Sequence, residues 1–159
     1  MRYDDNPFPT SDLDRHQIWD FIVRKDIDAY LAKDWSMVED DFWPENFMGI
    51  QAGGSANPDS WRLGFPTLEA YRDAWLSGTI DQADFAEELR PALFRVSMLR
   101  DIEIVGDKAL ARKKFDGRVE RKNGTFMMFK WQSIAYLRKG LDRWRVFGFT
   151  GYMPNPIQL

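Results

Sequence analysis

Apolar and polar positions in residues 12–42 recur with the period of a helix, and this stretch contains no glycine or proline. The apolar stripe consists of Trp19, Ile22, Val23, Ile27, Tyr30 and Leu31. Ser11 is in position to cap the start of this helix. Residues 33–36 interrupt the pattern, and Ser36 is in position to begin a second helix that Pro44 ends. The pattern therefore predicts one long helix followed by a short one.

The middle of the chain predicts shorter elements separated by loops. Residues 47–51 are typical of a short strand, and residues 53–60 (GGSANPDS) have the composition of a loop. Thr67 is in position to cap another helix, and Gly78 ends it. Residues 81–90 are acidic and predict one or two helical turns before the next proline.

The C-terminal half has the pattern of long strands. Four strand-like runs follow one another: 92–104, 108–121, 125–138 and 143–152. The pair Asn123-Gly124 favours a tight hairpin turn, because both central residues of such a turn need positive φ. Adjacent strands joined by tight turns form an antiparallel meander. The chain is therefore predicted to be an α+β domain, in which N-terminal helices pack on a long curved antiparallel sheet.

Large apolar side chains occur on both faces of the predicted sheet. In the third run, Met127, Phe129 and Trp131 lie on one face, and Met128 and Ile134 lie on the other. Helices can cover one of these faces. We expect a second copy of the chain to cover the other, which predicts a homodimer through the outer sheet face. The alternative is that the aliphatic stems of lysine and arginine cover it.

Length and aromatic content extend this picture. A chain of 159 residues fits one domain, and we expect residues 1–10 to form a flexible arm and residues 11–159 to form that domain. Aromatic residues make up 15% of the chain, with 7 Trp and 12 Phe. This share leaves apolar surface beyond the core, which is available to line an internal pocket.

Charge and residue usage narrow the function classes. The formal net charge is −3, and the basic residues are dispersed among acidic ones, which argues against nucleic acid as a partner. The chain contains no cysteine and one histidine, so we expect no disulfide, no metal site and no cofactor. No apolar run approaches the roughly 20 residues of a membrane helix. The N-terminus also lacks a signal peptide's apolar core, so we expect a cytoplasmic protein with no membrane partner.

Two segments resemble a known family. Residues 28–35 read DAYLAKDW at the end of the predicted first helix, and residues 142–154 read DRWRVFGFTGYMP. With the order of the elements, these motifs resemble the nuclear transport factor 2-like, or SnoaL-like, superfamily over about residues 12–154. The resemblance implies a cystatin-like cone, in which a bent sheet wraps over helices and encloses a pocket. It also implies a dimer formed through the outer face of the sheet.

The predicted first helix carries candidate catalytic side chains within its apolar stripe. A helix advances about 100° per residue, so His16 and Asp26 lie on the same face as Trp19 and Tyr30. Asp26 and Tyr30 are four residues apart, which allows their side chains to meet. A carboxylate and a phenol at this spacing can transfer a proton next to a carbonyl group.

The resemblance also implies which sheet residues face the pocket. It places Lys130 and Gln132 on the inward face of their strand, with Phe147 and Phe149 beside them. An ammonium group and an amide in these positions would complete a polar site among aromatic walls.

Known enzyme mechanisms of the superfamily do not transfer to this chain. The catalytic tyrosine of ketosteroid isomerases corresponds to Asp26, and their base and second acid correspond to residues without carboxyl groups. In scytalone dehydratases, Tyr30 matches a catalytic tyrosine, but the neighbouring acid corresponds to Leu31. Their two sheet histidines have no counterpart, since the single histidine is His16. Neither activity is expected here.

The favoured hypothesis is a cofactor-independent lyase, isomerase or cyclase that acts on a small apolar or aromatic ketone-like metabolite. Asp26 would shuttle the proton, Tyr30 and Lys130 would donate hydrogen bonds to the oxyanion, and Gln132 would orient the ligand, with His16 as a further catalytic candidate. The aromatic walls would be formed by Trp19, Trp43, Phe147 and Phe149. Trp61 would be a lid over the pocket mouth.

Other interpretations remain open. Asp26 can form a structural ion pair with Lys130 or a nearby arginine, Tyr30 can belong to the core, and His16 can bond to a neighbouring aspartate. Gln132 can tie the strand to a helix, and tryptophans often belong to cores. The corresponding functions are a non-catalytic protein that binds or carries a hydrophobic ligand, and a structural dimer or adaptor with a vestigial pocket.

Overall fold

The N-terminal helix is long and contains one irregular turn. In the computed structural model, which describes residues 1–157, α1 (Leu13–Trp19) continues through a π-helical segment (Asp20–Lys25) into α2 (Asp26–Ala32). The cap is the side chain of Asp12, which accepts a hydrogen bond from Arg15 N, and not Ser11. The helix ends where Lys33 takes a left-handed conformation with φ 55°.

The predicted second helix is replaced by two short 3₁₀ turns. They span Trp35–Met37 and Glu39–Asp41. Asp34 caps the first of them, because its side chain accepts hydrogen bonds from the amide and the hydroxyl of Ser36. The interruption at residues 33–36 is therefore as predicted, but the helix expected after it is wrong.

Two further helices follow. The helix α3 (Leu68–Ser77) is capped by Thr67, as predicted from the sequence. The helix α4 (Leu89–Val96) occupies residues that were expected to begin a strand. Pro91 lies in its first turn, where an amide N–H has no partner within the helix, so the proline is tolerated there.

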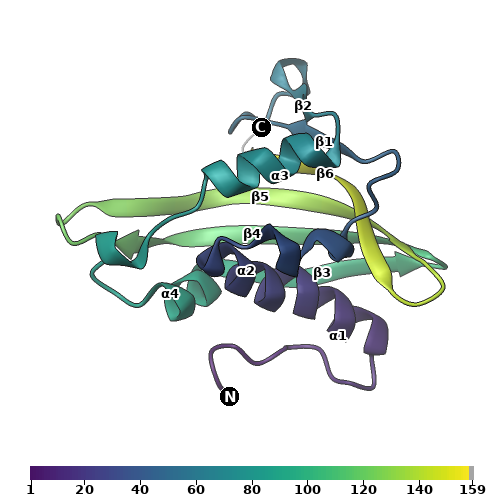
Figure 1. The fold of residues 1–159 in the computed structure, drawn as a ribbon, viewed down its shortest axis with the longest axis horizontal. Helices are drawn as coiled ribbons and strands as arrows, with labels where there is room; N and C mark the ends of the chain where they lie inside the picture. Colours follow the sequence, from purple (N-terminus) through teal and green to yellow (C-terminus); the bar gives the residue numbers. More distant parts are fainter. Residues whose placement is uncertain (158–159) are drawn as a thin grey trace.

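Six strands form one curved, unclosed sheet with the helices on one face (Figure 1). The strands are β1 (Met48–Gln51), β2 (Arg62–Phe65), β3 (Ser97–Val105), β4 (Lys108–Glu120), β5 (Phe126–Lys139) and β6 (Trp144–Pro154). Their order in the sheet is β2-β1-β6-β5-β4-β3. The α+β class and the antiparallel meander from β3 to β6 are confirmed. The sheet as a whole is mixed, however, because β1 pairs with β6 in parallel.

Strand alternation decides which side chains meet the helices. In β5, Phe129 and Leu137 are buried, whereas Met128 and Lys130, on either side of Phe129, are exposed. Odd-numbered residues of β5 therefore point inward. The pairing of β4 with β5 sets Lys113 opposite Ser133, so Lys113 belongs to the same inward face.

The first ten residues lie along the helices. Asp4 forms an ion pair with Arg90 of α4 at 2.9 Å, and the backbone oxygen of Phe8 lies 2.7 Å from His16 Nδ1. The flexibility of this segment stays a prediction, and the predicted domain boundary at residue 159 lies outside the described residues. Within residues 1–157, no helix has the length and apolar character needed to cross a membrane.

Candidate functional site

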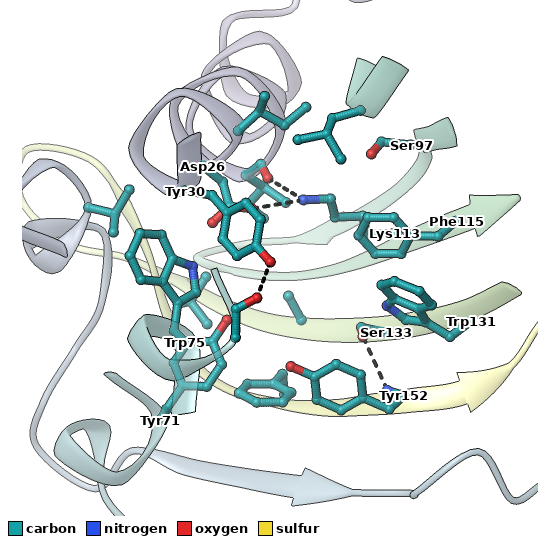
Figure 2. A pocket seen from close by; sticks show the side chains of 18 of the residues that line it. Asp26, Tyr30, Tyr71, Trp75, Ser97, Lys113, Phe115, Trp131, Ser133 and Tyr152 are labelled. Atoms are coloured by element: carbon teal, nitrogen blue, oxygen red, sulfur yellow. Dashed lines mark hydrogen bonds and ion pairs between the residues drawn. The ribbon is translucent and has the colours of Figure 1, made fainter. Parts of the chain in front are cut away.

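A cavity of about 370 Å³ lies between the helices and the inner face of the sheet. Its walls come from α2 and α3 on one side and from β4, β5 and β6 on the other (Figure 2). Along the sheet it extends from Met127, which pairs with Val119, to Val146, which pairs with Leu137. Most lining side chains are apolar, so the few polar groups that reach the cavity determine where a ligand can form hydrogen bonds.

The ammonium group of Lys113 is held by a carbonyl that the helix irregularity frees from its usual partner. In a regular α-helix the amide of Asp26 would donate to Ile22 O. At the end of the π-helical segment it donates instead to Val23 O, three residues back, as in a 3₁₀ turn. Lys113 Nζ donates to Ile22 O at 2.8 Å. The irregular turn thus anchors a lysine that reaches across from β4.

Lys113 and Asp26 form the charged centre of the cavity. Lys113 Nζ lies 3.2 Å from Asp26 Oδ2, and the Lys113 side chain is only 11% exposed. A buried ammonium group is costly without a partner, so the carboxylate and the Ile22 carbonyl stabilise it. Asp26 keeps 34% of its side-chain surface exposed and remains accessible from the cavity. The pair therefore places an accessible carboxylate beside a fixed positive charge.

Three tyrosines bring phenol groups to the same space. Tyr30 comes from α2, Tyr71 from α3 and Tyr152 from β6, as Figure 2 shows. The Tyr30 hydroxyl donates to the carbonyl oxygen of Gly78 at the end of α3. Within residues 1–157, the hydroxyls of Tyr71 and Tyr152 make no hydrogen bond. Two phenols are thus left free to bond to a ligand.

Burial keeps these phenols protonated. It raises the pKa of Tyr30 from 10.0 to about 12, with the Asp26 carboxylate as the next largest cause. Burial also raises the pKa of Tyr71 well above its usual value, and it raises the pKa of Tyr152, again with Asp26 contributing. The Asp26 carboxylate thus acts on all three phenols, which line the same cavity as it does. At neutral pH they are hydrogen-bond donors.

The tyrosines predict a loss of stability in strong base. A phenol whose folded pKa is raised contributes stability that is complete below pH 10 and falls as the pH rises toward the folded value near 12 for Tyr30. We expect the absorbance increase at 295 nm to lag in the native protein relative to the protein in guanidinium chloride. The Tyr30→Phe variant should reduce this lag. Coincident titration curves for the native and unfolded wild-type protein would contradict the prediction.

Stacked aromatic rings form a flat wall on the sheet side. The centroids of Phe115 and Trp131 are 4.6 Å apart at an interplanar angle of 29°, and those of Phe129 and Trp131 are 5.0 Å apart at 26°. On the other side, Phe149 packs against Tyr71 at 4.8 Å. Such walls favour a flat ligand, because stacking rewards parallel rings.

Comparison with known proteins identifies the fold. No family model matches the sequence, and no curated protein matches it. A nuclear transport factor 2-like protein of unknown function from Silicibacter pomeroyi matches with a TM-score of 0.57 and 10% identity over 91% of this chain and 98% of that one. A nuclear transport factor 2-like superfamily protein from Salmonella enterica matches with a TM-score of 0.56 and 14% identity over 92% and 94%. The chain has the nuclear transport factor 2-like fold.

A third structure gives the same result. A nuclear transport factor 2-like protein of unknown function from Shewanella baltica has a TM-score of 0.54 and 14% identity over 92% of this chain and 97% of that one. At such identities the likeness is one of fold. The fold suggested by the sequence motifs is therefore confirmed, and the chemistry must be argued from the cavity itself.

The nuclear transport factor 2-like fold brings together three of the predicted site residues. Asp26, Tyr30 and Phe149 all line the cavity. His16 does not, since it lines a separate hollow of about 320 Å³ with its Nδ1 beside the Phe8 carbonyl. Lys130 also lies elsewhere, because it forms an ion pair with Asp116 on the outer face of the sheet.

The inward orientation expected for Lys130 and Gln132 is wrong. Even-numbered residues of β5 point away from the helices, and one residue of register reverses the face of every side chain in a strand. Gln132 Nε2 donates to Pro154 O at 2.8 Å and ties β5 to β6. Phe147 likewise lies outside, beside Tyr136 with ring centroids 6.3 Å apart.

The predicted tryptophan walls also lie outside the cavity. Trp19 is buried against Phe94, with ring centroids 6.3 Å apart. Trp43 lies under the guanidinium groups of Arg138 and Arg145. Trp61 is not placed as a lid, because its indole N–H donates to Ser55 O at 2.8 Å within its own loop. These residues stabilise the fold locally.

Sequence reasoning missed Lys113, although the alternation contained a signal. The inward positions of β4 before and after it are small or apolar: Ala109, Ala111, Phe115, Gly117 and Val119. A lysine in the middle of such a series is either buried with a partner or part of a site. Tyr71 and Tyr152 were recognisable only as members of a helix stripe and a closing strand. No group of three or more metal-ligating side chains occurs within the part of the chain that the structure describes.

Proposed function

We propose that the chain binds a flat, largely apolar carbonyl compound in the cavity and moves a proton on it. One observation carries the proposal: an accessible carboxylate, a fixed ammonium group and two unpartnered phenols share a largely apolar cavity. Proteins of this fold often contain a ligand-binding pocket. The aromatic wall of Phe115 and Trp131 supports a flat ligand.

In the proposed reaction, Asp26 accepts a proton from the carbon next to the carbonyl group and returns it to a neighbouring position. The carbonyl oxygen gains negative charge as the proton leaves, and Tyr71 and Tyr152 donate hydrogen bonds to it. Lys113 contributes positive charge and so takes the role that the sequence analysis gave to Lys130. An isomerase, lyase or cyclase can use this step.

A non-catalytic carrier is the second candidate. The 3.2 Å contact between Lys113 and Asp26 favours it, because an ion pair at this distance is also a structural feature that neutralises both groups. The two candidates differ in whether the bound compound is chemically changed.

A thermal-shift screen against flat aryl ketones, followed by mass spectrometry of each stabilising compound, tests the proposal. We expect stabilisation by at least one compound and its recovery in changed form. Lys113→Met should weaken binding roughly 10- to 100-fold, since a hydrogen bond to a charged group contributes roughly 1.5–3 kcal/mol. Lys130→Met makes the same substitution on the outer face of the same sheet and should bind as the wild type does. Recovery of every ligand unchanged would favour the carrier, and no stabilisation would refute both.

We also propose that the outer face of the sheet forms a homodimer. The helices lie on the other face (Figure 1). The outer face carries Met128, which is 54% exposed, and, farther along the sheet, the half-buried side chains of Ile134, Tyr136 and Phe147. We expect sedimentation equilibrium to give twice the chain mass of 18.7 kDa. Ile134→Asp should shift the protein toward the monomer. A wild-type monomer at micromolar concentration would contradict the proposal.

A further inference from the structure

One buried carboxylate at the inner end of the cavity has an oxygen without a partner. Asp41, in the second 3₁₀ turn, is 2% exposed and lines the cavity. Its Oδ1 accepts hydrogen bonds from Lys25 Nζ at 2.7 Å and from Arg143 Nη2 at 2.6 Å. Its Oδ2 is buried and makes no hydrogen bond within residues 1–157. An unpaired buried acceptor of this kind is rare, because it loses its hydration without compensation.

The two cations reach Asp41 from outside the cavity. Lys25 and Arg143 line the separate hollow that also contains His16, and they do not line the main cavity. Asp41 thus lies in the wall between the two spaces, with Oδ1 bonded on the side of the hollow. Of the other residues that line the cavity, Val38 and Phe42 are close to Asp41 in the chain and Val146 pairs with Phe42, and their side chains offer no donor. A hydrogen bond to Oδ2 must come from another molecule.

Asp41 and the Lys113–Asp26 pair lie at different levels of an elongated cavity. Lys113 is opposite Ser133 in β5, whereas Asp41 lies at the level of Leu137, because Phe42 and Leu137 both neighbour Val146. Four residues of strand separate these levels, which is roughly 13 Å along β5. The cavity therefore has a proton-transfer position in its middle and a hydrogen-bond acceptor at its inner end.

We propose that the ligand carries a hydroxyl group at the end opposite its carbonyl group, and that Asp41 Oδ2 accepts the hydrogen bond from it. A neutral donor fits better than an ammonium group, because two cations already bond to the single carboxylate. The proposal rests on the proposed function and adds the substrate class: a flat, elongated hydroxyaryl ketone. Asp41 acts as a specificity residue and takes no part in the proton transfer.

A matched set of three probes tests this assignment in the wild-type protein. Chalcone, 4-hydroxychalcone and 4-methoxychalcone share one flat aryl ketone skeleton and differ only in the group at one end. We expect calorimetry to show that the hydroxyl compound binds at least about 10-fold more tightly than the other two, since these cannot donate to the carboxylate. Equal affinities for the three would overturn the assignment and leave the proposed function standing. No binding by any of them, nor by other aryl ketones, would overturn both.

The Asp41→Asn variant provides a second test. Its amide keeps an oxygen for Lys25 and Arg143 and presents N–H groups where Oδ2 was, so the preference should change from the hydroxyl to the methoxy compound. Asp20→Asn is the matched control, because Asp20 lines only the separate hollow that contains His16 and pairs with Arg24. The control should keep the wild-type preference. A variant at position 41 that still prefers the hydroxyl compound would overturn the assignment, and if it fails to fold, the wild-type series decides.

Discussion

The Asp26→Asn variant is expected to lose turnover of any ketone that the wild type converts, by roughly 100- to 10,000-fold. Asparagine has nearly the same size and keeps an oxygen for Lys113, so the fold and the cavity should persist. It cannot accept a proton at neutral pH, which removes the base and leaves the phenols in place. Product formation followed by mass spectrometry at saturating ligand measures the loss, and binding should change far less than turnover.

Asp101→Asn provides the matched control for this prediction. Asp101 is an exposed carboxylate of β3 that pairs with Lys114 at 3.4 Å and has no part in lining the cavity. The control should retain wild-type turnover. Retained turnover in Asp26→Asn as well would exclude Asp26 as the base, whatever the affinity for the ligand.

The elements of this fold follow from local patterns, and their exceptions depend on tertiary contacts. The gap-free stripe from Trp19 to Tyr30 predicts the first helix. Asn123-Gly124 predicts the turn between β4 and β5, but only Gly124 of the pair has positive φ, so the turn is not the expected type with two such residues. The parallel pairing of β1 with β6 joins segments about 100 residues apart, which periodicity does not encode. Likewise, the strand expected from residue 92 begins at Ser97, because α4 packs its apolar residues against the sheet.

The candidate site was predictable only in part. Asp26, Tyr30 and the sheet residue Phe149 line the cavity as predicted, whereas His16 and Trp19 of the first helix do not. Asp26 and Tyr30 lie on the predicted face, since helical geometry fixes which residues share a side. For β5 the family resemblance indicated the wrong face. Lys130 and Gln132 were therefore both predicted to face the site, although both lie outside it. Alternation alone did not decide the face, because large apolar residues such as Phe129 and Ile134 occur on both faces of this strand.

The anchoring of Lys113 had no signal in the sequence. A π-helical turn differs from an α-helix by one hydrogen-bond step, and residues Asp20–Lys25 contain no glycine or proline that would mark it. The carbonyl of Ile22 becomes a partner for Lys113 only when β4 packs against this turn. The site therefore depends on a helix irregularity and a strand that are nearly 90 residues apart.

We expect the free energy of unfolding to depend strongly on the contact between the last strand and the first helix. Trp144, at the start of β6, is 0% exposed and joins the last strand to the first helix. Its backbone N–H donates to Gln17 Oε1 at 3.0 Å, and its indole N–H donates to Asp14 Oδ1 at 2.9 Å. Lys139 also bonds to Asp14, and these two donors hold the pKa of that carboxyl below its usual value.

Trp144→Ala is therefore expected to lower the free energy of unfolding by about 3–5 kcal/mol, measured by urea denaturation. The loss combines an unfilled volume in the core with an Asp14 carboxylate that keeps only Lys139 as a partner. Trp43→Ala is the matched control, since Trp43 lies near the surface under Arg138 and Arg145 and should cost about 1–2 kcal/mol. Similar losses in the two variants would show that the junction between β6 and α1 contributes no more than a surface contact. A larger loss in Trp144→Ala, with faster hydrogen exchange of the β5 and β6 amides, would show that the stability of the cavity walls depends on this junction.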